Sequence, residues 1–128
     1  MIRPAAYPDL GLLLLRVWFG GTMAFAHGLP KLQKLLAGNY EFADPLGLGP
    51  GLSLALAVFG EFVCGLLVAM GLFSRLAAIP AAFTMAVAAF ITHGADPFAK
   101  KELALAYLFA FLVVAVAGPG RYSIDGRR

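Results

Sequence analysis

The sequence predicts an all-α integral membrane protein: a four-helix bundle, up-down-up-down, forming one domain over residues 1–128. Hydrophobic residues make up 61% of the chain and charged residues only 13%, whereas about a quarter of a soluble domain is usually charged. Four nearly uncharged runs approach the roughly 20 residues that a helix needs to cross a hydrocarbon core. Soluble apolar helices are the alternative, but each would need a polar stripe toward water, and none of the runs shows one.

The four expected spans follow one another with short connections. Pro30 should end the first span, because proline lacks an amide donor and disfavours helix in the residue before it. The two-residue connection at Ser74 and Arg75 makes the second and third spans antiparallel neighbours. The expected spans are about residues 10–29, 51–73, 76–94 and 102–118.

The segment 31–38 is expected to form a short helix in the headgroup region rather than part of a span. Lys31 and Lys34 lie three residues apart with leucines beside them, a pattern typical of an interfacial helix. The Gly/Pro-rich stretch 44–51 then leads into the second span.

Basic residues indicate the orientation in a cell inner membrane. Four crossings place both termini on one side. That side carries Arg3, Arg75, Arg121, Arg127 and Arg128, and the other side carries Lys31, Lys34, Lys100 and Lys101. Arg16 lies near the terminal side and favours cytoplasmic termini by the positive-inside rule. The net charge of +3 does not indicate nucleic-acid binding, because the basic residues are spread over both sides and do not form one patch.

Small residues recur at helical spacing in every span and indicate its packing face, because helices in lipid pack through small side chains. Each stripe also carries ionisable residues, so we expect these to point into the bundle. The stripes are Arg16, Gly20, Ala24 and Gly28; Ala57, Glu61, Gly65 and Ala69; Ala78, Ala82, Ala86, Ala89 and His93; and Glu102, Ala106 and Ala110.

Arg16 and Glu61 are expected to form an intramembrane ion pair. They lie on packing faces at depths that a long arginine side chain can bridge, and an unpaired charge at the bilayer centre costs about 2.5 to 3.5 kcal/mol on insertion scales. The alternative is that such a pair only fixes helix register.

A second polar group is expected at the opposite membrane face, formed by His27, Lys31, His93 and Glu102. These residues suit a quinone headgroup, an anionic sulfur species or a metal; the alternative is ordinary interfacial polarity. A metal needs three or four close ligands, and only the two histidines and Glu102 qualify without strain, so no metal site is assigned. No catalytic residue is assigned either.

Cys64 is the single cysteine, which excludes an intramolecular disulfide and a CxxC relay. We expect it to be a small residue at a helix contact. The sequence has no Rossmann glycines, haem-attachment motif or Fe–S cysteine set. Redox chemistry would therefore need a borrowed cofactor such as quinone.

Several short motifs together resemble the DoxX family, in their order and spacing over nearly the whole chain. They are His27-Gly28-Leu29-Pro30-Lys31-Leu32, Gly60-Glu61 with Gly65, Gly71-Leu72-Phe73-Ser74-Arg75, and the run from His93-Gly94 through Glu102 to Gly118-Pro119-Gly120-Arg121-Tyr122-Ser123-Ile124-Asp125. The resemblance implies a four-helix membrane protein grouped with the small membrane subunit of thiosulfate:quinone oxidoreductase. Eukaryotic relatives act as endoplasmic-reticulum cargo receptors, so the fold alone does not decide function.

Three hypotheses follow. The first is a membrane subunit of a redox system that binds quinone or a reduced sulfur compound beside a partner redox protein. The second is a non-catalytic membrane partner or anchor for another enzyme or cargo, and the third is a small transporter. The small-residue stripes would also serve a homo-oligomer within the lipid bilayer.

Overall fold

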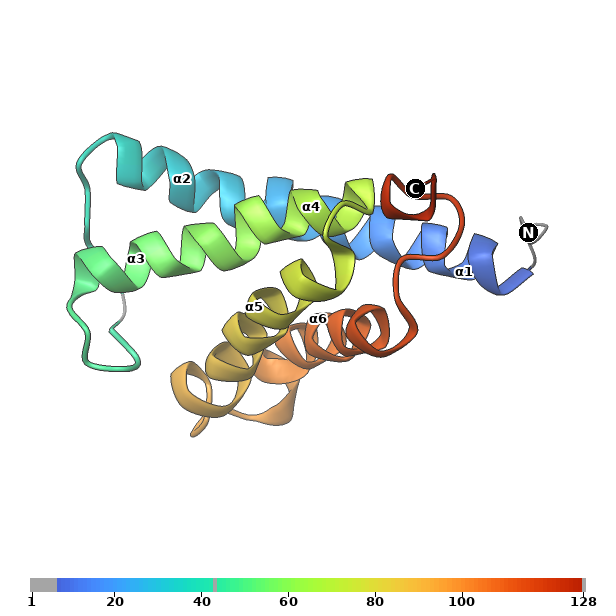
Figure 1. Cartoon of the computed structure of the whole chain (residues 1–128). Coiled ribbons are helices and arrows are strands. Elements are labelled where there is room, and N and C mark those ends of the chain that lie inside the picture. Colours follow the sequence, from blue (N-terminus) through green and yellow to red (C-terminus); the bar gives the residue numbers. More distant parts are fainter. Residues whose placement is uncertain (1–6, 43, 128) are drawn as a thin grey trace.

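A computed structural model describes residues 7–42 and 44–127, and within these ranges all regular structure is helical (Figure 1). Arg3 and Arg128, used above for orientation, lie outside the described residues. The elements are α1 (Tyr7–Leu15), η1 (Arg16–Gly20), η2 (Met23–Gly28), α2 (Leu29–Leu36), α3 (Pro50–Val58), η3 (Phe59–Val63), α4 (Cys64–Met70), α5 (Ser74–Val87), η4 (Ala88–Thr92), α6 (Phe98–Ala117) and η5 (Asp125–Arg127).

The first four elements join into one helix, Tyr7–Leu36. The expectation that Pro30 ends the first span and that residues 31–38 form a separate interfacial helix was therefore wrong. Proline removes one backbone hydrogen bond, but the π-helical stretch η2 directly precedes it, and such a stretch absorbs the local change in helical register. The helix continues through Pro30, and Lys31 stays on it.

Two further helices are long and apolar enough to cross a membrane. They are Pro50–Met70, made of α3, η3 and α4, and Ser74–Thr92, made of α5 and η4. Tyr7–Leu36 is called the first helix below, and Pro50–Met70 the second helix. The second span ends earlier than expected because Gly71 (φ 73°) and Phe73 (φ 50°) both adopt left-handed conformations in the turn before α5.

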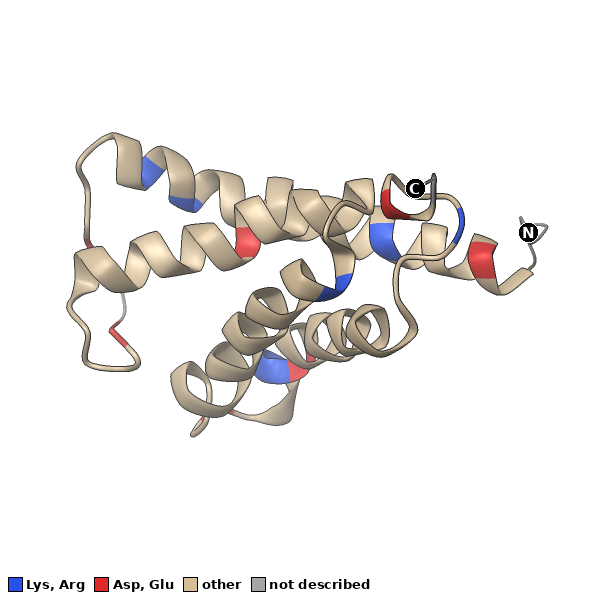
Figure 2. Cartoon of the chain, in the orientation of Figure 1, with Lys and Arg blue, Asp and Glu red and all other residues tan. Residues whose placement is uncertain are grey.

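The helix α6 has 20 residues, and its charged residues lie close to its N-terminus. Lys100, Lys101 and Glu102 occupy that region, and the remainder of the helix is uncharged. In Figure 2, too, long stretches of helix carry no charged residue.

The first and second helices lie side by side, and α5 packs against α6 below them (Figure 1). Gly20 and Gly65 allow the first pair to touch through backbone: a Cβ on Gly20 would lie 2.7 Å from the Gly65 carbonyl oxygen. This confirms the predicted packing faces of those two helices. The main buried cluster is Met23, Cys64, Val68, Ala77, Ala78, Ala81, Ala82, Met85, Tyr107, Leu108, Phe111 and Val114.

The predicted packing face of α6 was wrong in part. Glu102 and Ala106 are exposed, whereas Tyr107 and Phe111 are buried together with Ala110. The larger side chains fill the space beside α5, and the carboxylate of Glu102 stays outside because burial would remove its hydration.

Candidate functional site: a polar cavity between the helices

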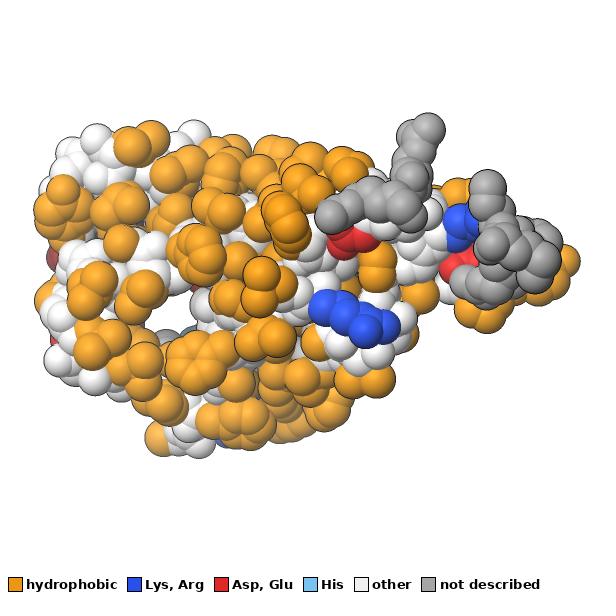
Figure 3. Space-filling view, in the orientation of Figure 1, with side chains coloured by type: hydrophobic (Ala, Val, Ile, Leu, Met, Phe, Trp, Pro, Cys, Tyr) orange, Lys and Arg blue, Asp and Glu red, His pale blue; other side chains and the backbone are white. Residues whose placement is uncertain are grey.

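A cavity of about 400 Å³ lies between the second helix and the α5–η4 helix. In the space-filling view its mouth is visible as a hollow between α3 and α5, surrounded by hydrophobic side chains (Figure 3). The lining residues are Lys31, Phe42, Pro45, Leu46, Leu48, Ser53, Leu56, Ala57, Phe59, Gly60, Glu61, Pro80, Phe83, Thr84, Met85, Val87, Ala88, Thr92 and His93. Its volume is within the range of small-molecule sites.

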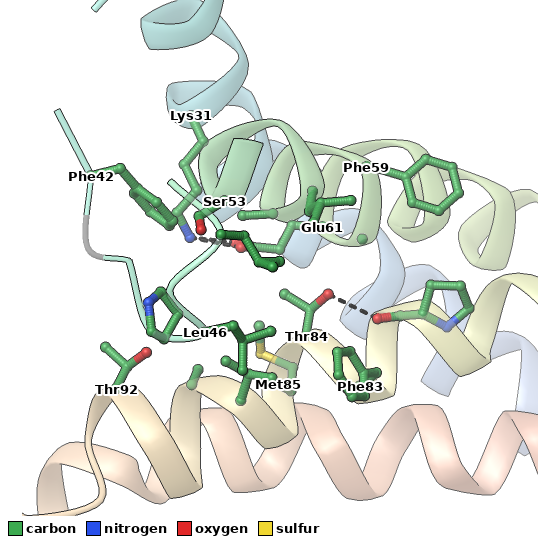
Figure 4. Close-up of a pocket in the computed structure, with 18 of the residues that line it drawn as sticks. Lys31, Phe42, Leu46, Ser53, Phe59, Glu61, Phe83, Thr84, Met85 and Thr92 are labelled. Carbon is green, nitrogen blue, oxygen red and sulfur yellow. Dashed lines mark hydrogen bonds and ion pairs between the residues drawn. The ribbon is translucent and has the colours of Figure 1, made fainter. Parts of the chain in front are cut away.

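Lys31 and Glu61 form an ion pair inside this cavity (Figure 4). The Lys31 Nζ atom donates to both carboxylate oxygens of Glu61, at 2.7 and 2.8 Å. Glu61 is 2% exposed and lies on η3, near the middle of its helix. The Lys31 ammonium also lies 5.9 Å from the centre of the Phe42 ring, a cation–π contact.

Two hydroxyl groups in the cavity wall already donate hydrogen bonds to the protein. Thr84 Oγ1 donates to the carbonyl oxygen of Pro80 at 2.8 Å, and Ser53 Oγ donates to Asp44 at 2.8 Å. The second helix approaches α5 closely here, since a Cβ on Gly60 would lie 2.1 Å from Thr84 Oγ1. The other polar side chains that line the cavity are Lys31, Glu61, Thr92 and His93.

His93 lines the cavity at the end of η4. Its Nδ1 atom lies 2.9 Å from a carboxylate oxygen of Asp96. This hydrogen bond, with the neighbouring positive charges, holds the pKa of Asp96 below its ordinary value. A carboxylate on Nδ1 favours the tautomer or cation with a proton on that nitrogen, and so orients the ring.

The four residues expected at one mouth do not come together. Lys31 and His93 line the cavity, but His27 packs edge-on against Tyr107, with ring centres 5.4 Å apart, and Glu102 is exposed outside it. The described residues contain no group of three histidine, cysteine or carboxylate side chains placed to hold a metal ion.

Glu61 pairs with Lys31 rather than with the expected partner, Arg16. Arg16 is 1% exposed and donates to the carbonyl oxygens of Val68 at 3.3 Å and Ala69 at 3.1 Å, and to that of Tyr122. The first two carbonyls belong to the last turn of α4, where a cation is favoured, and the Val68 oxygen also accepts a hydrogen bond from the Gly71 amide at 3.0 Å.

The C-terminal segment provides the rest of the Arg16 environment. Arg16 interacts electrostatically with Asp125, whose carboxylate accepts hydrogen bonds from the backbone amides of Phe73 and Ser74 and from the Ser74 hydroxyl. Arg16 therefore joins α4 to the chain end, which folds back over the α4–α5 turn.

Sequence reasoning did not identify the Lys31–Glu61 pair, although a signal was present. Lys31 lies three residues beyond Gly28 and therefore on nearly the same face of the helix. Gly28 touches the second helix beside Glu61, since a Cβ on Gly28 would lie 2.6 Å from the Phe62 nitrogen. Interpreting Pro30 as a helix end hid this relation.

Comparison with known proteins agrees with the membrane architecture. The model of the DoxX family matches residues 11–94. The chain is 33% identical over 124 residues to the inner membrane protein YqjF of Escherichia coli (strain K12), covering 91% of each chain. No solved structure matches the chain. The family match, the inner membrane relative and the three apolar helices agree, and the chain is a small inner membrane protein that belongs to the DoxX family.

Proposed function

We propose that this chain is a membrane subunit of a redox system that binds a quinone headgroup in the cavity between the second helix and α5. The observation that carries the proposal is the Lys31–Glu61 pair, with Glu61 almost fully buried in a largely apolar cavity. Both partners line the cavity, so a ligand that enters it can contact the ammonium and the carboxylate.

The net charge of the pair selects the ligand class. The charges of Lys31 and Glu61 cancel. An anion that enters the cavity is repelled by the carboxylate and a cation is repelled by the ammonium, because the apolar surroundings screen charge weakly. A neutral molecule with carbonyl oxygens avoids both penalties. Two of the three Lys31 N–H groups suffice for the two Glu61 oxygens, which leaves one for a ligand carbonyl. This favours quinone over an anionic sulfur compound.

The protein groups supply binding and proton exchange, and a bound quinone supplies the electron-accepting chemistry. Lys31 donates to a ligand oxygen, and Glu61 and His93 exchange protons near it. His93 suits this because its imidazole ring has two nitrogens, one of which can donate a proton while the other accepts one. The electrons come from a partner redox protein, since the sequence carries no motif for a redox centre of its own.

A titration with a short-chain quinone analogue tests this function. The parent protein in mild detergent should show saturable thermal stabilisation, and thiosulfate in the same assay should give none. Lys31→Met and His93→Ala should weaken the response, whereas Glu102→Gln serves as a control because Glu102 lies outside the cavity. No saturable response in the parent, or equal responses in the His93 and Glu102 variants, would favour the non-catalytic anchor.

We further infer that α6 also crosses the membrane, which completes an up-down-up-down bundle with both termini in the cytoplasm. Support comes from its length of 20 residues and its packing on α5. In a Cys64→Ala background, Lys100→Cys and Arg121→Cys flank α6 and should react with an impermeant maleimide from opposite sides. Labelling of both from one side would contradict the fourth crossing.

A further inference from the structure

The mouth of the cavity is lined by apolar side chains that are exposed on candidate membrane-spanning helices. Leu56, Phe59 and Phe83 line the cavity and are also 47%, 49% and 61% exposed. The first two lie on the second helix and Phe83 lies on α5, both within candidate membrane spans. Figure 3 shows a hollow in a largely hydrophobic face of the molecule. An opening bordered by exposed apolar side chains of two candidate spans would face the hydrocarbon layer.

The end of the cavity toward the α2–α3 connection is covered instead. Phe42, Pro45 and Leu46 from this connection line the cavity (Figure 4). Asp44 fixes the following turn, because its carboxylate accepts hydrogen bonds from the amides of Leu48 and Gly49 at 2.9 and 3.0 Å. Apolar side chains therefore line the cavity at this end, beside the partly exposed ammonium of Lys31.

We propose that the opening between Leu56, Phe59 and Phe83 is a lateral portal through which a lipid-dissolved, tailed ligand enters from the bilayer. Its polar head reaches Lys31 and Glu61, and its apolar tail stays between the second helix and α5. The identity of the head as a quinone rests on the proposed function, whereas the route depends only on the cavity and its rim. A tail left in the hydrocarbon layer never has to be exposed to water during entry.

Met85 and Met23 provide an internal comparison for this route. Both are buried, at 7% and 1% exposure, and both belong to the core cluster. Met85 lines the cavity and Met23 does not. A probe confined to the lipid can therefore reach Met85 through the portal, whereas Met23 is buried away from the cavity lining.

The portal is tested by photolabelling in proteoliposomes containing a phospholipid with a diazirine in its acyl chain. Peptide mass spectrometry should find label on Met85 and none on Met23. Leu56→Trp, which narrows the rim, should reduce the labelling of Met85. Leu112→Trp, a matched change at an exposed position of α6 outside the cavity, should leave it unchanged.

The outcomes separate the portal from the proposed function. An unlabelled Met85 beside a labelled Phe83, or equal labelling of Met85 and Met23, would overturn the portal. Labelling of Met85 that an added short-chain quinone does not reduce supports the portal and contradicts the quinone. Saturable quinone binding with Met85 unlabelled supports the quinone and contradicts the portal.

Discussion

Lys31 and Glu61 are 30 residues apart in sequence, yet the ammonium of one contacts both carboxylate oxygens of the other inside a largely apolar cavity. Lys31 is 31% exposed and Glu61 only 3% at the side chain. The two charges therefore lose unequal amounts of hydration, and removing the lysine leaves the more deeply buried charge without a partner.

Lys31→Met alone should consequently be more damaging than the loss of both charges. We expect a loss toward the lower end of about 3 to 5 kcal/mol, because Lys31 is partly exposed, and a much smaller loss in the double variant with Glu61→Gln. Thermal unfolding of the four proteins in one detergent measures the coupling. Purely additive losses would show that the pair contributes no interaction energy.

Arg16 should couple to the chain end and not to Glu61. Arg16→Lys keeps the charge, but one ammonium cannot reproduce the planar guanidinium fork that reaches α4 and Tyr122 together. We expect faster proteolysis after residue 118 in this variant, and additive stability losses when Arg16→Met is combined with Glu61→Gln. A strong coupling between Arg16 and Glu61 would contradict the structure and revive the pairing expected from sequence.

Gly20→Ala should disrupt the contact between the first and second helices. The added Cβ would lie 2.7 Å from the Gly65 oxygen and 2.8 Å from the Ala69 nitrogen, both backbone atoms that cannot move independently. Overpacking of this kind costs about 1 to 3 kcal/mol. Gly21→Ala is the matched control, since nothing lies within 4 Å of its Cβ position, and it should be neutral or slightly stabilising. Equal melting temperatures for the two variants would rule out this close contact.

Asp44 gives a pH dependence outside the membrane spans. The hydrogen bond from Ser53, supported by backbone amides, holds the pKa of Asp44 below its ordinary value. Its stabilising contribution is therefore fully present above the unfolded pKa of about 3.9 and is lost as the pH falls through the lower, folded pKa. Asp44→Asn should melt below the parent at neutral pH, and the difference should shrink in acid. A difference that is constant with pH would exclude the charge as its cause.

How far the sequence predicts this molecule depends on whether a contact is local. Helix positions followed from uncharged runs, and the packing faces that carry Gly20 and Gly65 followed from small residues at four-residue spacing within each helix. The prediction that Pro30 ends the first span was wrong because the lost backbone hydrogen bond was considered without the π-helical stretch before Pro30. Only the folded helix shows that stretch. The contacts of Arg16 could not be predicted from the sequence either, because Tyr122 and Asp125 lie more than 100 residues further along the chain. Neither hydrophobic periodicity nor depth identifies such a partner.

The continuity of the first helix has a consequence for how the protein sits in a bilayer. A helix of 30 residues is about 45 Å long, whereas the hydrocarbon layer is about 30 Å thick. The helix must tilt or project beyond the acyl chains, and where it projects at its C-terminal end, the last turns, which carry Lys31, would reach the edge of the layer. Membrane thickness would then act on the ammonium of Lys31 before it acts on Glu61, which the middle of the second helix holds at depth. A thicker bilayer would draw the two charges into the same hydrocarbon environment, and a thinner one would leave the lysine in water.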